Sequence, residues 1–180
     1  DAAIELLTSR SECEIQASGD RVRASSTFVG GDGLQRHTPL HAFDKDRTTF
    51  FHSACGLPMA PWWISLNFES LTAISTIRLT SDAPADYPEN WELQGRAEAN
   101  APFASLLRVQ NDPGISCAMT LGSTRRKQFT CDQPQTRSYE LQRPGDYLEY
   151  RILVHSVSNA RRQDRNCLRI SEVTFVGPCA

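Results

Sequence analysis

The stretch that decides the fold is Trp62-Trp63-Ile64-Ser65-Leu66-Asn67-Phe68. Large apolar side chains recur at every second position, and mostly polar side chains lie between them. One face of an extended chain would carry Trp62, Ile64, Leu66 and Phe68, and the other Trp63, Ser65 and Asn67. An alternation of period two predicts a β-strand with one buried face.

Further stretches repeat this strand signal. The longer ones, at 74–79, 91–95, 147–154 and 168–176, are rich in β-branched and aromatic residues. Shorter strands are predicted at 22–25, 105–110, 127–131 and 138–141. Turn-forming clusters separate the strands at 30–33, 82–84, 111–114 and 143–146. Helices are expected only as short segments at 2–9 and 40–43.

Many short strands separated by turns predict an all-β fold, an antiparallel β-sandwich or jelly roll. The sequence contains no internal repeat, low-complexity tract or linker. We therefore expect a single domain over residues 1–180.

Composition narrows the class of protein. The chain has 180 residues, a formal net charge of −2 and a hydrophobic fraction of 39%. That length supports a buried core, and a charge near zero gives no attraction to nucleic-acid phosphates. No apolar run approaches the roughly 20 residues that span a bilayer. The chain begins at Asp1 without methionine, so we interpret it as a mature or trimmed part of a secreted or surface protein.

The six cysteines are scattered and form no CxxC pair, which favours an oxidised, extracellular domain over a zinc ribbon. Six cysteines allow fifteen pairings, and the sequence does not choose among them. The favoured pair is Cys13 with Cys179, which would join the two termini. Cys117 with Cys131 would close a hairpin-sized loop, and Cys55 with Cys167 remains by elimination.

The loop at 41–52 carries the clearest chemistry. Asp44 and Asp46 stand two residues apart, and the hydroxyl of Thr49 follows three residues later. Hard oxygen ligands in an irregular loop suit calcium. The alternative is a polar turn before a strand. The spacing is not that of an EF-hand, since the glycine and the distal glutamate are missing.

Several motifs together resemble the discoidin family, also called coagulation-factor (F5/8) type C or galactose-binding-like domains. The stretch from Ala42 to Ser53 is similar to the family's A-x-D-G-x-x-x-T-x-W-x-S signature, with Lys45 in place of glycine and Phe51 in place of tryptophan. The resemblance covers about residues 21–176. The other matching stretches lie at 23–26, 61–66, 87–95 and 168–173.

This resemblance implies a structural calcium ion that clamps the last strand to the first long loop. Side-chain ligands would come from Asp44, Thr49 and Glu172. Further oxygens, from backbone or side chain, would come from His41, Asp46 and Ser171.

The resemblance also implies a ligand surface made by loops at one end of the sandwich. Three loops qualify, at 26–40, 81–90 and 155–167, because they combine planar polar groups with aromatic rings, as sugar recognition requires. The candidate ligand-binding residues are Arg36, His37, Asp82, Tyr87, Asn159, Arg161, Arg162 and Arg165. The alternative for each loop is a solvated surface.

Two subgroups of the family suggest more specific ligands. His52 matches a histidine of the eel-type fucose lectins, but Arg78 is displaced and residues 80–86 contain no arginine, so the fucose triad is not intact. Members that bind phospholipid use apolar loop tips, for which Phe28 and Val29 or the segment 57–59 would serve.

We therefore predict a non-catalytic, calcium-stabilised recognition module that binds carbohydrate on cell surfaces or matrix. The alternatives are a protein–protein interaction module of a larger surface or secreted protein, and peripheral phospholipid binding. No nucleophile elbow, HExxH or phosphate-binding motif indicates an enzyme.

Overall fold

The computed structural model of the chain describes residues 11–15, 21–30, 32–33, 37–56, 60–116, 131, 133–142, 144–158 and 167–179. Within these ranges no helix has the length and apolar character needed to cross a membrane. The helix predicted at 2–9 and most of the strand predicted at 127–131 lie outside the described residues.

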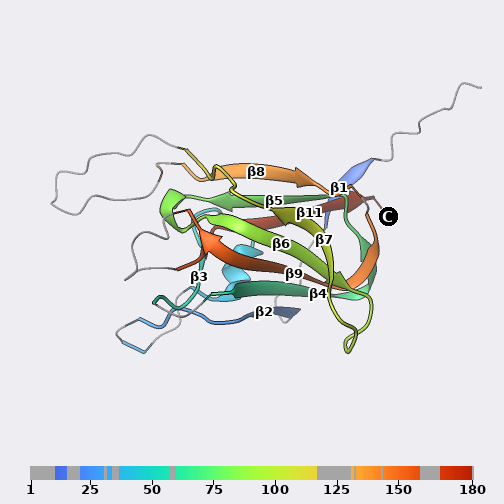
Figure 1. Cartoon of the computed structure of the whole chain (residues 1–180), viewed down its shortest axis with the longest axis horizontal. Helices are drawn as coiled ribbons and strands as arrows, with labels where there is room; N and C mark the ends of the chain where they lie inside the picture. Colours follow the sequence, from blue (N-terminus) through green and yellow to red (C-terminus); the bar gives the residue numbers. More distant parts are fainter. Residues whose placement is uncertain are drawn as a thin grey trace, which may run out of the picture.

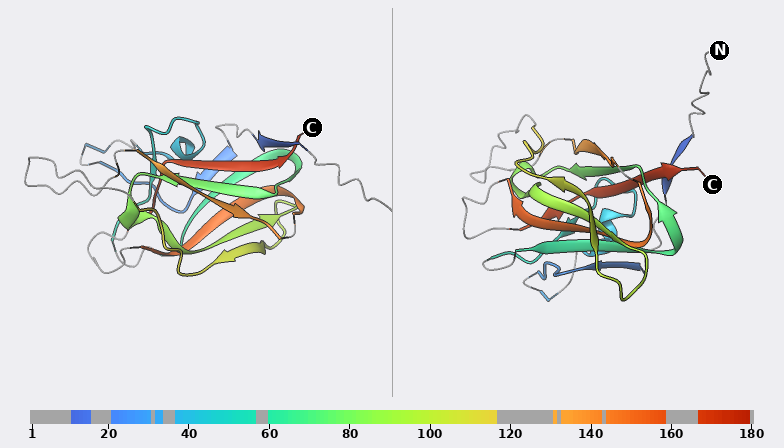
Figure 2. Two further views of the ribbon diagram at one scale, coloured as in Figure 1. Left: turned by 90° about the horizontal axis from the view of Figure 1, so that it is seen from above. Right: turned by 45° about the vertical axis from the view of Figure 1, so that its right-hand side comes forward.

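Two large antiparallel sheets face each other as a sandwich (Figures 1 and 2). One has the strand order β1-β11-β5-β8 and the other β2-β4-β9-β6-β7, while β10 and β3 form a separate two-stranded sheet. The strands are β1 (Glu12–Ile15), β2 (Val22–Ala24), β3 (Phe51–His52), β4 (Trp62–Ala73), β5 (Thr76–Ser81), β6 (Pro88–Arg96), β7 (Ala104–Val109), β8 (Gln135–Glu140), β9 (Asp146–Val157), β10 (Arg169–Ile170) and β11 (Glu172–Pro178). Short 3-10 helices lie at η2 (Pro39–Ala42) and η3 (Pro84–Asp86). The predicted antiparallel β-sandwich is confirmed.

The core lies between the two large sheets. The alternation in β4 has the predicted effect in part: Trp62, Ile64 and Leu66 are at most 2% exposed and Trp63 is partly exposed, but Ser65 is also buried and Phe68 is only partly buried. Rings from the two sheets meet in the core, with the centroids of Tyr150 and Phe175 5.6 Å apart. Burial of these large apolar and aromatic side chains is the main force that holds the sheets together.

The last predicted strand is not continuous. The stretch 168–176 divides at Ser171 into β10 and β11, which belong to different sheets. The Ser171 N–H donates to the carbonyl of Thr80 at 2.8 Å, where the chain passes from one sheet to the other. The strands β1 and β3 were not predicted, because segments of two to four residues are too short to show a period.

Disulfides hold both ends of the sandwich. Cys13–Cys179 joins β1 to the chain after β11, and Cys55–Cys167 joins the segments after β3 and before β10. Both predicted pairs are confirmed. Cys131 is also disulfide-bonded. Its predicted partner, Cys117, lies outside the described residues.

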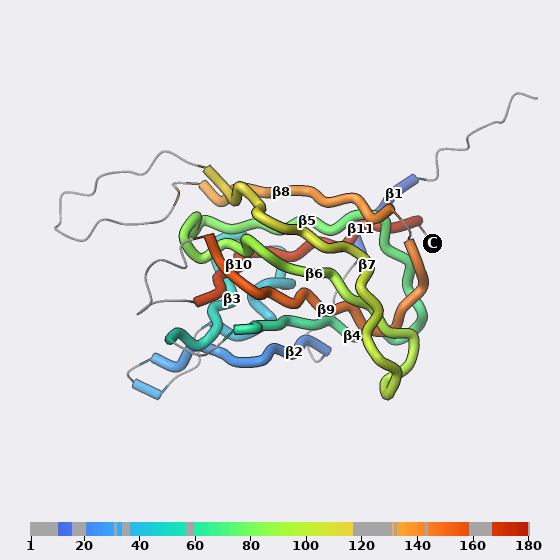
Figure 3. Tube along the Cα trace, in the orientation of Figure 1, coloured from blue at the N-terminus to red at the C-terminus, as the bar shows by residue number. Residues whose placement is uncertain are grey.

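The pairing of β3 with β10 brings together segments far apart in the sequence. His52 lies opposite Arg169 and Phe51 opposite Ile170. Figure 3 shows these strands at one end of the sandwich, close to the loops that lead into and out of the large sheets. The loop from η2 to β3 and the last two strands therefore meet at this end.

Candidate functional site

The loop between η2 and β3 is curled around its own carboxylates. Asp44 Oδ1 accepts a hydrogen bond from the N–H of Asp46 at 2.9 Å, and Asp46 Oδ1 accepts from both the N–H and the hydroxyl of Thr48. The two bonds from Thr48 lower the pKa of Asp46. Lys45 has a φ of 63°, in the left-handed region that favours glycine. Glycine is the residue that the discoidin signature has at this position.

Oxygen atoms of this loop converge on the Thr49 hydroxyl. Thr49 Oγ1 lies 2.8 Å from Asp44 Oδ2, 2.9 Å from the carbonyl oxygen of Asp46 and 3.5 Å from that of His41. Four of the residues predicted as metal ligands, His41, Asp44, Asp46 and Thr49, are thus together in space.

Glu172, at the start of β11, faces the same loop. Its side chain accepts a hydrogen bond from the backbone of Lys45, and the residue is only 6% exposed. Burial and the nearby charge of Asp44 raise the pKa of Glu172 to about 7. Its Oε2 is buried without a hydrogen-bond partner, as is Ser171 Oγ.

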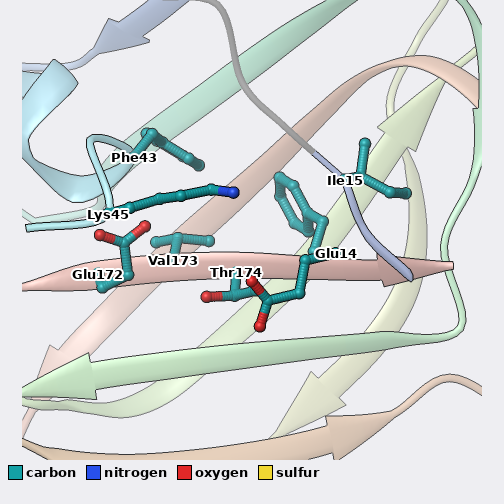
Figure 4. A pocket seen from close by; sticks show the side chains of 8 residues that line it. Glu14, Ile15, Phe43, Lys45, Glu172, Val173 and Thr174 are labelled. Atoms are coloured by element: carbon teal, nitrogen blue, oxygen red, sulfur yellow. The ribbon is translucent and has the colours of Figure 1, made fainter. Parts of the chain in front are cut away.

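A small cavity lies beside Glu172, which is the one predicted ligand among the residues that line it. It has a volume of about 20 Å³ and lies between β1, β11 and the loop, with Lys45 reaching across it (Figure 4). A space of this size admits a water molecule or an ion but not a sugar. The negative charge of a buried, incompletely bonded carboxylate near a second carboxylate is neutralised either by a proton or by a bound cation. Carboxylate oxygens are ligands that suit a hard cation.

A second group of possible ligand atoms does not form a metal site. One ring nitrogen of His52 and the sulfur atoms of Cys55 and Cys167 lie within 4.8 Å of one another. Both sulfurs belong to the Cys55–Cys167 disulfide, so they are not available as thiolates.

At the loop end, three planar groups form a stack. The rings of His37 and Phe50 are parallel to within 14° with centroids 4.1 Å apart, and the guanidinium of Arg169 lies 3.6 Å from the Phe50 centroid. Two groups at these distances cannot share one face of a ring, so Phe50 lies between them. The stack ends at Asp82, which accepts a hydrogen bond from Arg169 Nη2 at 2.6 Å.

His52 flanks this loop-end stack of His37, Phe50 and Arg169. Its Nδ1 lies 2.8 Å from the carbonyl oxygen of Ser53, an acceptor, so Nδ1 carries the proton. Burial lowers the pKa of His52, and the charges of Arg169 and His37 lower it further. The imidazole is therefore neutral at pH 7, and its Nε2 has a lone pair that accepts hydrogen bonds.

The predicted ligand residues have different outcomes. His37 and Asp82 lie in or beside the loop-end stack. Tyr87 is fully buried, and its hydroxyl bonds to that of Tyr139 at 2.8 Å, so the structure does not support the prediction that it contacts a ligand. The remaining predicted residues, Arg36, Asn159, Arg161, Arg162 and Arg165, lie outside the described residues.

Phe50 and Arg169 were not predicted as site residues. Phe50 precedes the buried Phe51, and Arg169 stands between the buried Leu168 and Ile170. A side chain between two buried positions of a short strand points away from the core, and this local signal was available. That the two side chains meet is a result of the β3–β10 pairing.

No family model and no curated protein matches the sequence. Several solved structures are similar in fold. Chitosan-binding module 1 of a chitosanase/glucanase from Paenibacillus sp. IK-5 has a TM-score of 0.61 at 15% identity, over 87% of this chain and 93% of that chain. The second module of that enzyme, in complex with chitotriose, has a TM-score of 0.59 at 14% identity, over 87% of this chain and 95% of that chain.

The family 32 carbohydrate-binding module of NanJ from C. perfringens, in complex with galactose, has a TM-score of 0.59 at 14% identity. The match covers 93% of this chain and the whole of that module. Identities this low show the fold alone. The chain therefore has the galactose-binding-like β-sandwich fold of these carbohydrate-binding modules.

Proposed function

We propose that this protein is a non-catalytic carbohydrate-binding module whose ligand binds at the loop-end stack. The observation that carries the proposal is the stack of His37, Phe50 and Arg169 beside a neutral His52. It lies on a fold shared with modules whose structures hold galactose or chitotriose. The disulfides Cys13–Cys179 and Cys55–Cys167 fit a secreted or extracellular module, with glycans of cell surfaces or matrix as partners.

The stack supplies the two kinds of contact that a sugar needs. The partly exposed ring of His37 at the end of the stack offers a flat surface for the C–H face of a pyranose. Nε2 of His52 would accept a hydroxyl proton, and N–H groups of Arg169 would donate to hydroxyl oxygens. The ion pair with Asp82 fixes the orientation of Arg169, so little side-chain entropy is lost on binding.

In the part of the chain that the structure describes, the phospholipid alternative has little apolar surface at this end, and its second candidate tip, 57–59, lies outside that part. Val29 is 51% and Leu40 40% exposed, but the ring of Phe28 packs edge-on against His52 with centroids 5.1 Å apart. Two exposed aliphatic side chains bury too little apolar area to anchor a protein in a membrane. A protein partner remains the competing outcome of the test below.

We also propose that calcium occupies the oxygen cluster of the loop at 41–49 and Glu172. Hard oxygens from two carboxylates, a hydroxyl and two carbonyls match the ligands that calcium takes. A cation there would compensate the buried Glu172 carboxylate and join β11 to the loop. Its role would be structural, because the ligands are supplied by the protein.

A glycan array probed with the disulfide-intact protein, with calcium and with EDTA, tests the carbohydrate proposal. We expect at least one glycan class to bind and the variant His37→Ala to weaken that binding about tenfold, a typical cost of losing an aromatic contact. The control is Arg78→Gln, because Arg78 lies in β5 of the four-stranded sheet and is not part of the loop-end stack. Absence of any glycan hit at high protein concentration would reject the proposal and favour a protein partner.

A further inference from the structure

A polar cavity opens on the outer face of the five-stranded sheet, where β6, β7 and β9 run side by side. Its volume of about 330 Å³ is at the lower end of the range for small-molecule sites. Glu92 points away from the core, because its neighbours Trp91 and Leu93 are fully buried. The polar residues that line the cavity are Asn90, Glu92, Arg108, Gln110 and His155.

Strand alternation places His155 at this cavity, because its neighbour Val154 is fully buried and faces the core. The pairing is locally irregular, since Asn90 pairs with Ser156 and Trp91 with Val154, but Pro88 pairs with Val157 and the register on both sides is the same. The exposed ring of His155 brings its Nε2 to 3.5 Å from Glu92 Oε1.

The charges in the cavity are balanced among themselves. Arg108 Nη2 lies 2.9 Å from Glu92 Oε1, and Gln94 Nε2 donates to Oε2 at 3.1 Å. Burial acts to raise the pKa of Glu92, but the bond from Gln94 and the charge of Arg108 outweigh it, and the net result is a lowered pKa. The carboxylate therefore stays ionised and holds its neighbours in position. A site with paired charges favours an uncharged polar ligand over an ion.

An aromatic surface lies in the same cross-strand row. The register pairs Trp63 with Leu153, Leu153 with Glu92, and Glu92 with Arg108. Neighbouring strands are about 4.8 Å apart, so Trp63 stands about 10 Å from the Glu92 position. The Trp63 indole is partly exposed on this outer face, and its flat apolar surface would accept the C–H side of a sugar ring.

We propose that this sheet face is a second carbohydrate-binding surface, which takes a neutral oligosaccharide. One sugar would lie in the cavity, with its hydroxyls bonded to Arg108, His155 and Asn90, and another would stack on Trp63. The surface shares its ligand class with the proposed function, but it uses no residue of the loop-end stack. The domain would then be bivalent, so that two weak contacts to one glycan-rich surface give higher avidity than either alone.

The test is a two-dimensional ¹H–¹⁵N NMR titration of the intact, disulfide-bonded chain with neutral trisaccharides. The probes are galactotriose, mannotriose, cellotriose and N-acetylchitotriose. We expect the Trp63 indole N–H and the side-chain amides of Asn90 and Gln110 to shift together with at least one probe. Arg108→Gln and Trp63→Ala should each weaken that binding about tenfold, and Trp63→Phe should retain most of it.

Arg78→Gln is the matched control, since Arg78 also pairs with a glutamate, Glu14 at 3.2 Å, but on the other sheet. Thermal unfolding of each variant checks that it is folded. The second surface would be overturned if no probe shifts the signals of Trp63, Asn90 and Gln110. It would also be overturned if the Arg108→Gln variant shows the same shifts as the wild type. Shifts at Trp63 without any at His37 or His52 would support this surface while rejecting the loop-end site.

Discussion

Replacing Glu172 by glutamine tests the cation site at its most buried ligand. The substitution preserves the shape of the side chain and its acceptor for the Lys45 backbone N–H, but removes the charge. In the metal-free protein the raised pKa means that ionisation of Glu172 is unfavourable. The penalty is absent below the usual pKa of 4.5, grows as the pH rises towards 7, and is complete above it.

The size of the effect follows from the pKa. A pKa of about 7 in place of 4.5 corresponds to a penalty of up to about 3 kcal/mol at alkaline pH. For a chain of this length, that energy shifts the melting temperature by roughly 6–12 °C. In EDTA at about pH 8, Glu172→Gln should therefore melt higher than the wild type by up to this amount, and at about pH 4.5 the two should nearly coincide.

Calcium should nearly close this gap. A ligand that binds only the folded state at a hundredfold excess over Kd stabilises it by about 2.7 kcal/mol, so the wild type should gain stability and Glu172→Gln should not. The assay is thermal unfolding followed by circular dichroism, with calcium or EDTA, at both pH values and with disulfides intact. The control is Glu98→Gln, which removes the same charge from an exposed turn. If wild type and Glu172→Gln share one pH profile and one calcium response, the ligand assignment is wrong.

Three further predictions concern other parts of the fold. Glycan binding at the loop end should weaken as the pH falls below the lowered pKa of His52, since protonation removes the Nε2 acceptor; calorimetric titration at several pH values checks this, and tighter binding in acid would contradict it. The double change Cys13→Ser with Cys179→Ser should lower the unfolding free energy by about 4–5 kcal/mol, because it opens a loop of almost the whole chain; an unchanged denaturation midpoint would argue against this. Gly177→Ala should destabilise the protein by about 1–3 kcal/mol, since the added Cβ would collide with the backbone carbonyl of Ala73; urea unfolding measures the effect, and a neutral result would mean that the strand ends move apart at little cost.

The oxygen cluster was predictable in part. Asp44, Asp46 and Thr49 lie within six residues of one another, so their convergence is a local property of one loop. Glu172 lies more than a hundred residues away, and only the family resemblance connected it to that loop. The structure agrees with this placement, and it adds the burial that raises the pKa of Glu172.

The loop-end residues show where sequence patterns fail. His37 and Asp82 were selected from separate loops, but Phe50 and Arg169, which join them, were missed. Tyr87 was selected because it stands in a polar segment, yet its ring is buried and its hydroxyl bonds to Tyr139. A tyrosine has an apolar ring and a polar hydroxyl, so it is compatible with both a polar loop and an apolar core. Its residue type therefore does not determine whether its side chain points to solvent or into the core.

The sequence by itself determined most of the strands and the sandwich they form, and it favoured the Cys13–Cys179 pair without fixing it. Period-two alternation, turn residues and cysteine placement are properties of the chain that do not depend on how its elements pack. The tertiary structure decided the end of β10 at Ser171, the stack of His37, Phe50 and Arg169, and the position of His155 beside Glu92. Each of these depends on strand register, and register is set by the packing of the whole core because a shift of one residue would turn every side chain to the opposite face.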